Sequence, residues 1–169
     1  MVSKILITES NDASTVNDKM NENGETELHL AAAQNMRLSA MSLIKLGADV
    51  NAVCNLNETP LHKAIKKGHS DRVHFLLENG ADLYSKNKNG ETPVYIAVKL
   101  NHKACLNILL ENGANVNHIQ NILPPEMVEK ILKLLKLKEI CQAQLVCKRW
   151  KNIIINGNLV KKVAGKMFE

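Results

Sequence analysis

The sequence predicts an all-α fold, a solenoid of three stacked helical repeats with short β-hairpin tips, followed by a small domain of three helices. Two sequence landmarks recur with a period of 33 residues, which is typical of stacked helix pairs. Aromatic residues make up only 3% of the 169 residues. The core must therefore be built from Leu, Ile, Val and Ala, and such side chains suit thin, stacked helices.

The first landmark opens each repeat and recurs at residues 24–32, 57–65 and 90–98. A threonine stands at the third position of every copy, as Thr26, Thr59 and Thr92. Threonine caps helix N-termini, and a proline at the first helical position, such as Pro60 or Pro93, loses no hydrogen bond there. Each repeat is therefore expected to begin with a short helix.

The second landmark begins with Gly-Ala and recurs at residues 47–51, 80–84 and 113–117. Nine positions with the same period hold only Gly or Asn, the residues that most readily adopt positive φ. They are positions 35, 68 and 101, then 47, 80 and 113, and finally 24, 57 and 90. We expect the first set to end the first helix, the second set to end the second helix, and the third set to lie in a tight turn at the tip.

Apolar residues follow the same register. Small residues stand where two helices must approach closely, at Ala31, Ala64 and Ala97. Two rows of larger residues run down the second helices, as Leu43, Leu76 and Leu109 and as Ile44, Leu77 and Leu110. These rows predict one core that continues from repeat to repeat.

Both landmarks resemble the signatures of the ankyrin repeat, Thr-Pro-Leu-His and Gly-Ala-Asp-Val-Asn at a 33-residue period. The resemblance covers residues 21–121 and divides them into repeats at about 24–56, 57–89 and 90–121. Residues 1–20 are interpreted as an N-terminal leader or a partial cap, because Thr15–Asn17 is similar to the end of a degenerate hairpin.

Residues 122–157 depart from the repeat and predict three helices. Apolar residues at 127, 128, 131, 132, 134 and 135 give the first of these helices a broad apolar face. So short a segment has more apolar residues than its own core can bury, which predicts a partner. Leu-Pro-x-Glu at 123–126 and Leu-Val-Cys-Lys-Arg-Trp at 145–150 resemble the F-box, and residues 158–169 follow as a C-terminal tail.

The F-box resemblance implies docking onto the small acidic adaptor subunit of an SCF-type cullin-RING ubiquitin ligase, and through it onto the cullin scaffold. The positions that fall where this family contacts the adaptor are Leu123, Pro124, Ile131, Leu132, Leu135, Val146, Cys147 and Trp150. Trp150 is the only Trp of the chain, and a buried aromatic residue is a common interface anchor. Pro125 replaces the acidic residue that is more common there, which bears on affinity.

The ankyrin resemblance implies that a target protein binds to the hairpin tips and to the outward side of the first helices. The residues expected to contact the target are Val53, Leu56, Glu58, Lys66, Lys67, Lys86, Lys88, Lys99, Leu100 and Ile119. Four of these are apolar at positions expected to face solvent, namely Val53, Leu56, Leu100 and Ile119. They are the favoured contacts, although single exposed apolar residues are also ordinary on surfaces.

The net charge of +5 lies in the C-terminal part of the chain. Residues 1–121 have 12 Lys and Arg against 13 Asp and Glu, whereas residues 122–169 have 10 against 4. A positive C-terminal part suits an acidic adaptor. Nucleic-acid or membrane binding through this Lys-rich part is an alternative. However, it has few aromatic residues for base stacking, and no apolar stretch approaches the ~20 residues of a membrane span.

We find no catalytic site, metal site or cofactor-binding motif in the sequence. His29 and His62 occupy one repeat position at which the third repeat has Tyr95, so this position is interpreted as a structural hydrogen-bonding one. The other histidines, His69, His74, His102 and His118, are expected to be solvated. The four cysteines have neither a paired framework nor the spacing of a zinc site, which favours a reducing compartment, and Cys105 is expected to be a packing residue.

The combined prediction is a non-enzymatic substrate receptor, monomeric before assembly, that links a target protein to the ligase. A scaffold that sequesters its target without recruiting a ligase is the main alternative. Abundant Lys, Asn and Ile with little Arg are typical of an AT-rich genome, and the domain pairing resembles effectors of rickettsial-type intracellular bacteria and poxviral ankyrin proteins. The expected place of action is therefore the cytoplasm or nucleus of a host cell, with no cleavable signal peptide and no transmembrane segment.

Overall fold

A computed structural model describes residues 16–18 and 21–114 of the chain. The helices of this part are α2 (Glu27–Ala33), α3 (Arg37–Lys45), α4 (Pro60–Lys66), α5 (Ser70–Glu78), α6 (Pro93–Lys99) and α7 (Lys103–Glu111). The predicted F-box helices and the C-terminal tail lie outside the described residues. No helix in the described part is both long and apolar enough to cross a membrane.

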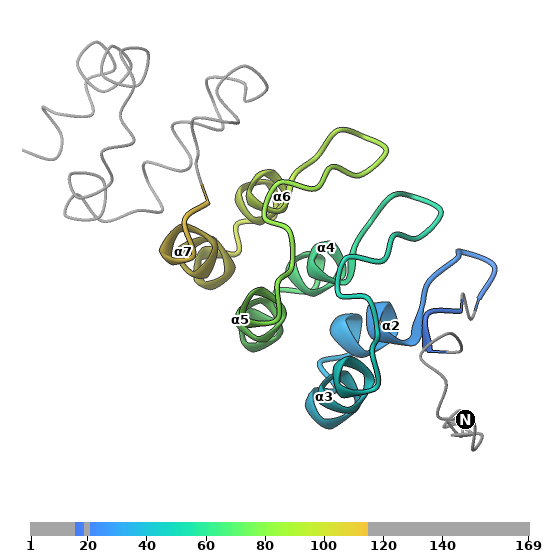
Figure 1. Ribbon diagram of the computed structural model, residues 1–169. Helices are drawn as coiled ribbons and strands as arrows, with labels where there is room; N and C mark the ends of the chain where they lie inside the picture. The colour runs from blue at the N-terminus through green and yellow to red at the C-terminus, as the bar shows by residue number, and fades with distance from the viewer. Residues whose placement is uncertain (1–15, 19–20, 115–169) are drawn as a thin grey trace, which may run out of the picture.

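The helices form two parallel rows (Figure 1). The first helices of the repeats, α2, α4 and α6, make one row, and the second helices, α3, α5 and α7, make the other. The central helix α4 packs against α2, α5 and α6, so each repeat contacts its neighbours as well as its own second helix. Three loops project side by side from the stack, and these loops are the tips of the repeats.

Each first helix begins where the sequence predicts. Thr26, Thr59 and Thr92 are the residues that precede α2, α4 and α6, and all three have extended backbone angles. The Thr59 hydroxyl accepts a hydrogen bond from the His62 backbone N–H at 3.4 Å, and Thr92 accepts one from the Tyr95 N–H at 3.3 Å. These bonds satisfy backbone donors that have no partner within the helix, which is why threonine recurs there.

All nine predicted Gly and Asn positions have positive φ, and they are the positive-φ residues of the described part of the chain. Asn35, Gly68 and Asn101 follow the first helices, at φ of 56°, 72° and 62°. The repeat therefore keeps a left-handed residue at the end of each helix and in each tip, as the sequence predicts.

A side chain at Gly68 would meet a close neighbour, whereas one at Gly80, Gly90 or Gly113 would not. The φ of Gly68 is +72°, and a Cβ built there would lie 2.9 Å from Cε1 of His102. Gly90 has a similar φ of +73°, but nothing lies within 4 Å of the equivalent Cβ. We expect Gly68→Ala to lower the free energy of unfolding by about 2–3 kcal/mol and Gly90→Ala by about 1 kcal/mol in urea denaturation. Equal losses would show that contact with His102 does not matter.

The core runs without a break through the three repeats. Ala31, Ala64 and Ala97 are buried at the approach of neighbouring helices, as predicted. The row of Leu43, Leu76 and Leu109 is also buried, and the row of Ile44, Leu77 and Leu110 packs against it partly exposed. Cys105 is a buried member of this core, and burial raises the pKa of its thiol to about 11. This confirms that Cys105 is a packing residue.

The predicted β-hairpin tips contain no strand in the described residues, so this detail of the predicted fold is corrected. One backbone hydrogen bond closes each of the last two tips, from Cys54 N–H to Glu58 O at 3.0 Å and from Asn87 N–H to Glu91 O at 3.1 Å. The chain reverses within these few residues, so a ladder of paired residues has no room to form. A bond from Lys88 N–H to Leu56 O, at 2.9 Å, joins the two neighbouring tips.

Asparagine side chains between the second helices and the tips form hydrogen bonds from one repeat to the next. Asn51 donates to Gly80 O at 3.0 Å and accepts from Asp82 N–H at 2.8 Å. Asn17 makes the same two contacts one repeat earlier, with Gly47 O at 3.2 Å and Asp49 N–H at 2.7 Å. Val16 packs partly buried against the core. Asn17 is therefore to the first repeat what Asn51 is to the second.

Candidate functional site

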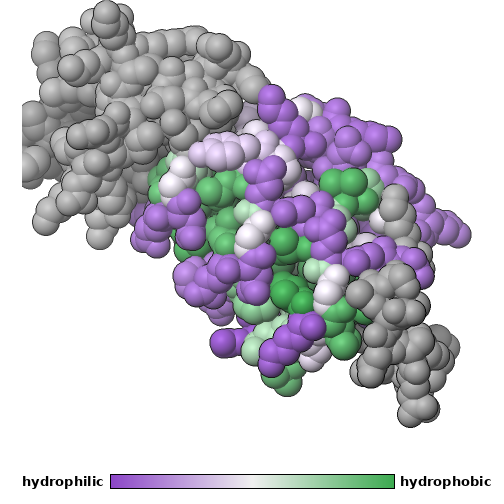
Figure 2. All heavy atoms as spheres, in the orientation of Figure 1, coloured by the Kyte–Doolittle hydropathy of each residue, from purple (hydrophilic) through white to green (hydrophobic). Residues whose placement is uncertain are grey.

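The predicted target contacts lie in the tips and at the C-terminal ends of the first helices. We define the inner surface as the exposed members of this set in the second and third repeats. They are Val53, Leu56, Lys66, Lys67, Lys86, Lys88, Lys99 and Leu100. Figure 2 shows hydrophilic residues gathered over the projecting loops, with hydrophobic residues interspersed on the same face of the stack. The predicted contact Ile119 lies outside the described residues.

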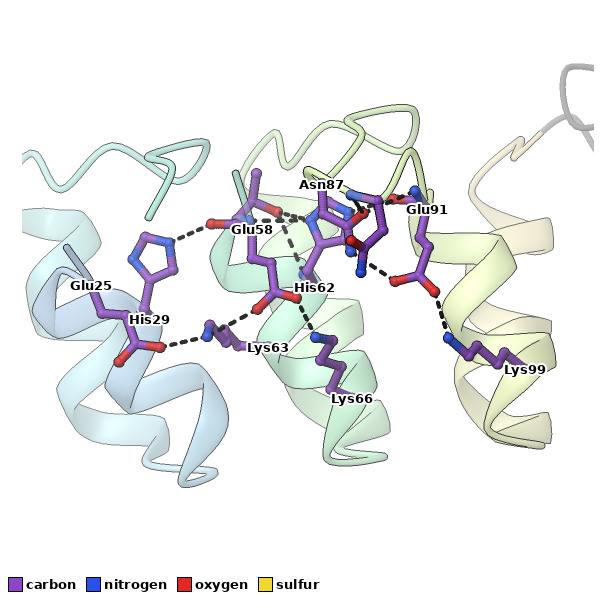
Figure 3. Close-up of polar contacts among 11 residues, drawn as sticks. Glu25, His29, Glu58, His62, Lys63, Lys66, Asn87, Glu91 and Lys99 are labelled. Carbon is purple, nitrogen blue, oxygen red and sulfur yellow. Dashed lines mark hydrogen bonds and ion pairs between the residues drawn. The ribbon is translucent and has the colours of Figure 1, made fainter. Parts of the chain in front are cut away.

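Glu58 is the predicted target contact that the structure corrects. Only 2% of Glu58 is exposed, so it has no free surface to offer a partner. Its carboxylate instead pairs with Lys63 at 2.9 Å and with Lys66 (Figure 3). The carboxylate turns inward because these two lysines on α4 reach it from the helix surface. Glu58 therefore holds Lys66 of the inner surface and is not itself a contact.

The glutamates 33 residues apart form a ladder with lysines along this side of the stack. Lys63 bridges two repeats, because it pairs with Glu25 at 2.5 Å as well as with Glu58. In the third repeat Lys99 pairs with Glu91 at 2.6 Å, in the same way that Lys66 pairs with Glu58. We call these residues, Glu25, Glu58, Glu91, Lys63, Lys66 and Lys99, the Glu–Lys ladder. The ladder links tip to helix within a repeat and the first repeat to the second.

Hydrogen bonds within the ladder favour the charged forms of Glu58, Glu91 and Lys63. Burial raises the pKa of the Glu58 carboxyl, but the hydrogen bonds from Lys66 and Lys63 outweigh burial and bring this pKa below its ordinary value. The hydrogen bond from Lys99 likewise lowers the pKa of Glu91. Burial lowers the pKa of Lys63, and its hydrogen bonds to Glu25 and Glu58 outweigh that effect and raise it. At neutral pH these three side chains are therefore ionised.

His29 and His62 connect each repeat to the next, and both are buried. Nδ1 of His29 accepts the Thr26 backbone N–H at 3.1 Å, so the neutral ring has its proton on Nε2. Nε2 then donates to Glu58 O in the following tip at 2.8 Å. His62 reaches Glu91 O in the same way at 3.3 Å. These contacts confirm the prediction of a structural hydrogen-bonding position.

These two histidines predict a loss of stability in mild acid. Burial lowers the pKa of His29 and of His62, so the unfolded chain takes up protons before the folded one. The free energy of unfolding should therefore fall as the pH drops below about 6.5, the ordinary histidine value. In urea denaturation between about pH 7.5 and about pH 5.5, His29→Gln/His62→Gln should flatten this dependence. His74→Gln, at a largely exposed position on α5, is the control for loss of a histidine from the surface. An equal slope in all three proteins would contradict the assignment.

Two other histidines are less solvated than the sequence predicts. His69 precedes α5, is partly buried, and its Nε2 lies 3.1 Å from Ala33 O. His102 holds the equivalent position before α7, also partly buried, with its ring beside Gly68. Their 33-residue spacing is the signal that marks them as structural. His74 is largely exposed as predicted, and His118 lies outside the described residues.

Lys63 is the ladder residue that sequence reasoning misses. The equivalent positions in the other two repeats hold Leu30 and Ile96, so no periodic pattern marks it. The glutamates at positions 25, 58 and 91 do recur every 33 residues, and that spacing is the signal for the ladder. In the described residues no group of three or more His, Cys, Asp or Glu is arranged to hold a metal ion.

Comparisons with known families match almost the whole chain. A family model of ankyrin repeats matches three copies, over residues 1–87 and 28–120. A family model of the F-box domain matches residues 121–162. This range contains all of the predicted ligase-adaptor contacts, from Leu123 to Trp150, and these residues lie outside the described part of the chain. No curated protein is similar enough to the chain to be matched.

The two matched modules define the broad role of the chain. Ankyrin repeats and F-box domains are typically non-enzymatic interaction modules, and together they support a protein-interaction adaptor of SCF-type ligases. The ankyrin matches extend over residues 1–120 of 169, and the F-box match follows at once. The chain therefore belongs to the ankyrin-repeat proteins and carries an F-box domain after its repeats.

Proposed function

We propose that this protein is a substrate receptor of an SCF-type cullin-RING ubiquitin ligase, with the F-box holding the ligase and the inner surface holding the target. The observation that carries the proposal is the F-box match at residues 121–162, directly after an ankyrin stack with an exposed inner surface. One module without the other would bind a ligase or a target, but it would not bring the two together.

The ligase side of the proposal rests on the F-box residues and on charge. The proposed contacts with the acidic adaptor are Leu123, Pro124, Ile131, Leu132, Leu135, Val146, Cys147 and Trp150. Residues 122–169 have 10 basic and 4 acidic residues, so they attract an acidic partner at long range. The apolar residues of this set, Trp150 among them, would then supply the short-range affinity.

The target side of the proposal rests on the inner surface. Its lysines and its three apolar residues are exposed, and the Glu–Lys ladder beneath them joins tips to helices. Ile119 is proposed as a further contact at the end of the third repeat. A surface built on packed helices presents these side chains from a backbone that does not have to become ordered on binding.

The mechanism of such a receptor is proximity. A target held on the ankyrin stack stays near the transfer module of the ligase, which raises its effective concentration there. Lysines of the target would then meet the ubiquitin-carrying enzyme often enough to be modified, although this chain does no chemistry itself.

The proposal extends to the setting in which the chain works. Its high Lys, Asn and Ile content with little Arg is typical of an AT-rich genome, whereas F-boxes belong to eukaryotic ubiquitin machinery. We infer an effector that uses the ligase of a host cell, in the cytoplasm or nucleus, and that acts on host proteins.

Capture from a eukaryotic lysate tests this function. The intact chain should retain the ligase adaptor and the cullin, whereas the variant Leu123→Ala/Pro124→Ala/Ile131→Ala should retain neither. Proteins kept by both chains would be candidate targets. If the intact chain fails to retain the adaptor, or if the variant retains it equally, the ligase role is wrong. Retention of targets alone would support a scaffold that only sequesters them.

A further inference from the structure

We propose that the target presents an acidic segment with apolar side chains, and that this segment lies across the second and third repeats. The inference rests on the proposed function, because it assigns the partner of the same inner surface. It follows from three features of the described residues: an unbalanced positive charge, its absence from the first repeat, and exposed apolar side chains among the lysines.

The positive charge of the inner surface comes from lysines outside the Glu–Lys ladder. The ladder has three glutamates and three lysines, so its net charge is zero. Lys67, Lys86 and Lys88 are exposed, and none of the ion pairs in the described part of the chain involves them. The glutamates that end the second and third tips, Glu58 and Glu91, are already paired with ladder lysines. The charge that remains for a partner is therefore positive.

Lysines 63, 66 and 67 show how α4 presents this charge. They are three and four residues apart, so they lie on one face of the helix. The ladder fixes the direction of that face, because Lys63 and Lys66 both reach Glu58 at the base of the tip. Lys67 extends from the same helix end into solvent.

The first repeat lacks this charge. Ala33 and Gln34 stand where the second repeat has Lys66 and Lys67. In the tips the change is larger, because Glu22 of the first tip corresponds to Lys88 of the third tip. At these equivalent positions the charge therefore changes from slightly acidic in the first tip to basic at the end of α4 and in the third tip. An acidic segment would be attracted to the second and third repeats and weakly repelled from the first tip.

Apolar side chains stand among these lysines. Val53, Leu56 and Leu100 are 46%, 54% and 43% exposed. The backbone bond from Lys88 N–H to Leu56 O brings an apolar and a cationic residue together on adjacent tips. Leu100 directly follows Lys99 at the end of α6. A partner that is only charged would leave these apolar residues in water, whereas an acidic segment with apolar side chains can bury them.

A phage-displayed library of random peptides, panned against the intact full-length chain, tests the inference. Peptides that bind should be net negative and should have apolar residues between the acidic ones. Lys67→Glu/Lys88→Glu and Leu56→Ser/Leu100→Ser should each weaken the selected peptides by about tenfold or more. The matched control is Lys45→Glu/Lys103→Glu, which reverses two exposed lysines on the second helices and should have little effect. Circular dichroism should be the same for all of these chains, because every changed residue is exposed.

Other outcomes would overturn the inference. It is wrong if the library yields no binders, if the binders have no acidic excess, or if the control weakens them as much as the inner-surface variants do. Binding of single-stranded DNA that Leu56→Ser/Leu100→Ser leaves intact would point to a nucleic-acid partner instead. Capture of the ligase adaptor is measured in parallel with the same variants. Capture of the adaptor depends on the F-box, so failure of the intact chain to capture it would count against the proposed function. If the intact chain captures the adaptor but selects no acidic peptides, only this inference is wrong.

Discussion

Leu61→Ala is expected to lower the free energy of unfolding by about 2–5 kcal/mol. Leu61 lies on α4 and is fully buried, and α4 packs against α2, α5 and α6. A cavity there would weaken the central repeat and its contacts with both neighbours. In a solenoid of three repeats the neighbours have few other contacts to rely on, so the loss should spread to the whole stack.

Urea denaturation at neutral pH, followed by circular dichroism, measures this effect. Leu56→Ala is the matched control, because it removes the same side chain from a position that is 54% exposed. The control should change the free energy of unfolding by no more than about 0.5 kcal/mol. Similar losses in both variants would mean that α4 is not the centre of a continuous core.

Lys63→Met/Lys66→Met is expected to lower the free energy of unfolding by about 3 kcal/mol. It removes both cations that pair with the buried Glu58 carboxylate and leaves that charge without a partner. In this variant burial alone acts on Glu58, and burial raises its pKa above that of the unfolded chain. His29 and His62 destabilise both chains in acid, but the difference in stability between the variant and the parent chain should shrink as the pH falls and Glu58 becomes protonated.

Replacing Glu58 instead of the lysines distinguishes the free-energy penalty of an unpaired buried charge from the stabilisation that the ion pairs provide. Glu58→Met leaves Lys63 paired with Glu25 and leaves Lys66 close to solvent, so the loss should be about 1 kcal/mol or less. Adding Glu58→Met to the double variant should restore most of the stability, because no unpaired buried charge is left. Losses that simply add in the triple variant would contradict the account of the ladder.

The architecture is predictable because its determinants lie close together in the sequence and recur. Thr59 before Pro60, or Gly68 after α4, acts on its own turn of the chain, and the 33-residue period repeats each signal three times. The helix starts, the left-handed residues and the core rows follow from such local signals. The absence of strands from the tips does not follow from such signals, because the resemblance to a hairpin does not say how many residues form backbone pairs.

The candidate site is less predictable because its contacts join separate repeats. Glu58 looks like an exposed tip residue until Lys63 and Lys66 are placed beside it. The bridge from Lys63 to Glu25 depends on how two repeats stack, and no other repeat has a lysine at that position. The structure is therefore needed to find which single charged residues are buried, whereas the exposed lysines of the inner surface could be identified from the sequence.

Isothermal titration calorimetry of the purified, intact chain with the purified ligase adaptor tests the central claim most directly. We predict saturable binding of one adaptor per chain, weakened at least about tenfold by Leu123→Ala/Pro124→Ala/Ile131→Ala. Lys67→Glu/Lys88→Glu should bind the adaptor as the intact chain does, because these lysines belong to the target side. No binding by the intact chain, or binding that the F-box variant leaves unchanged, would contradict a role as a substrate receptor.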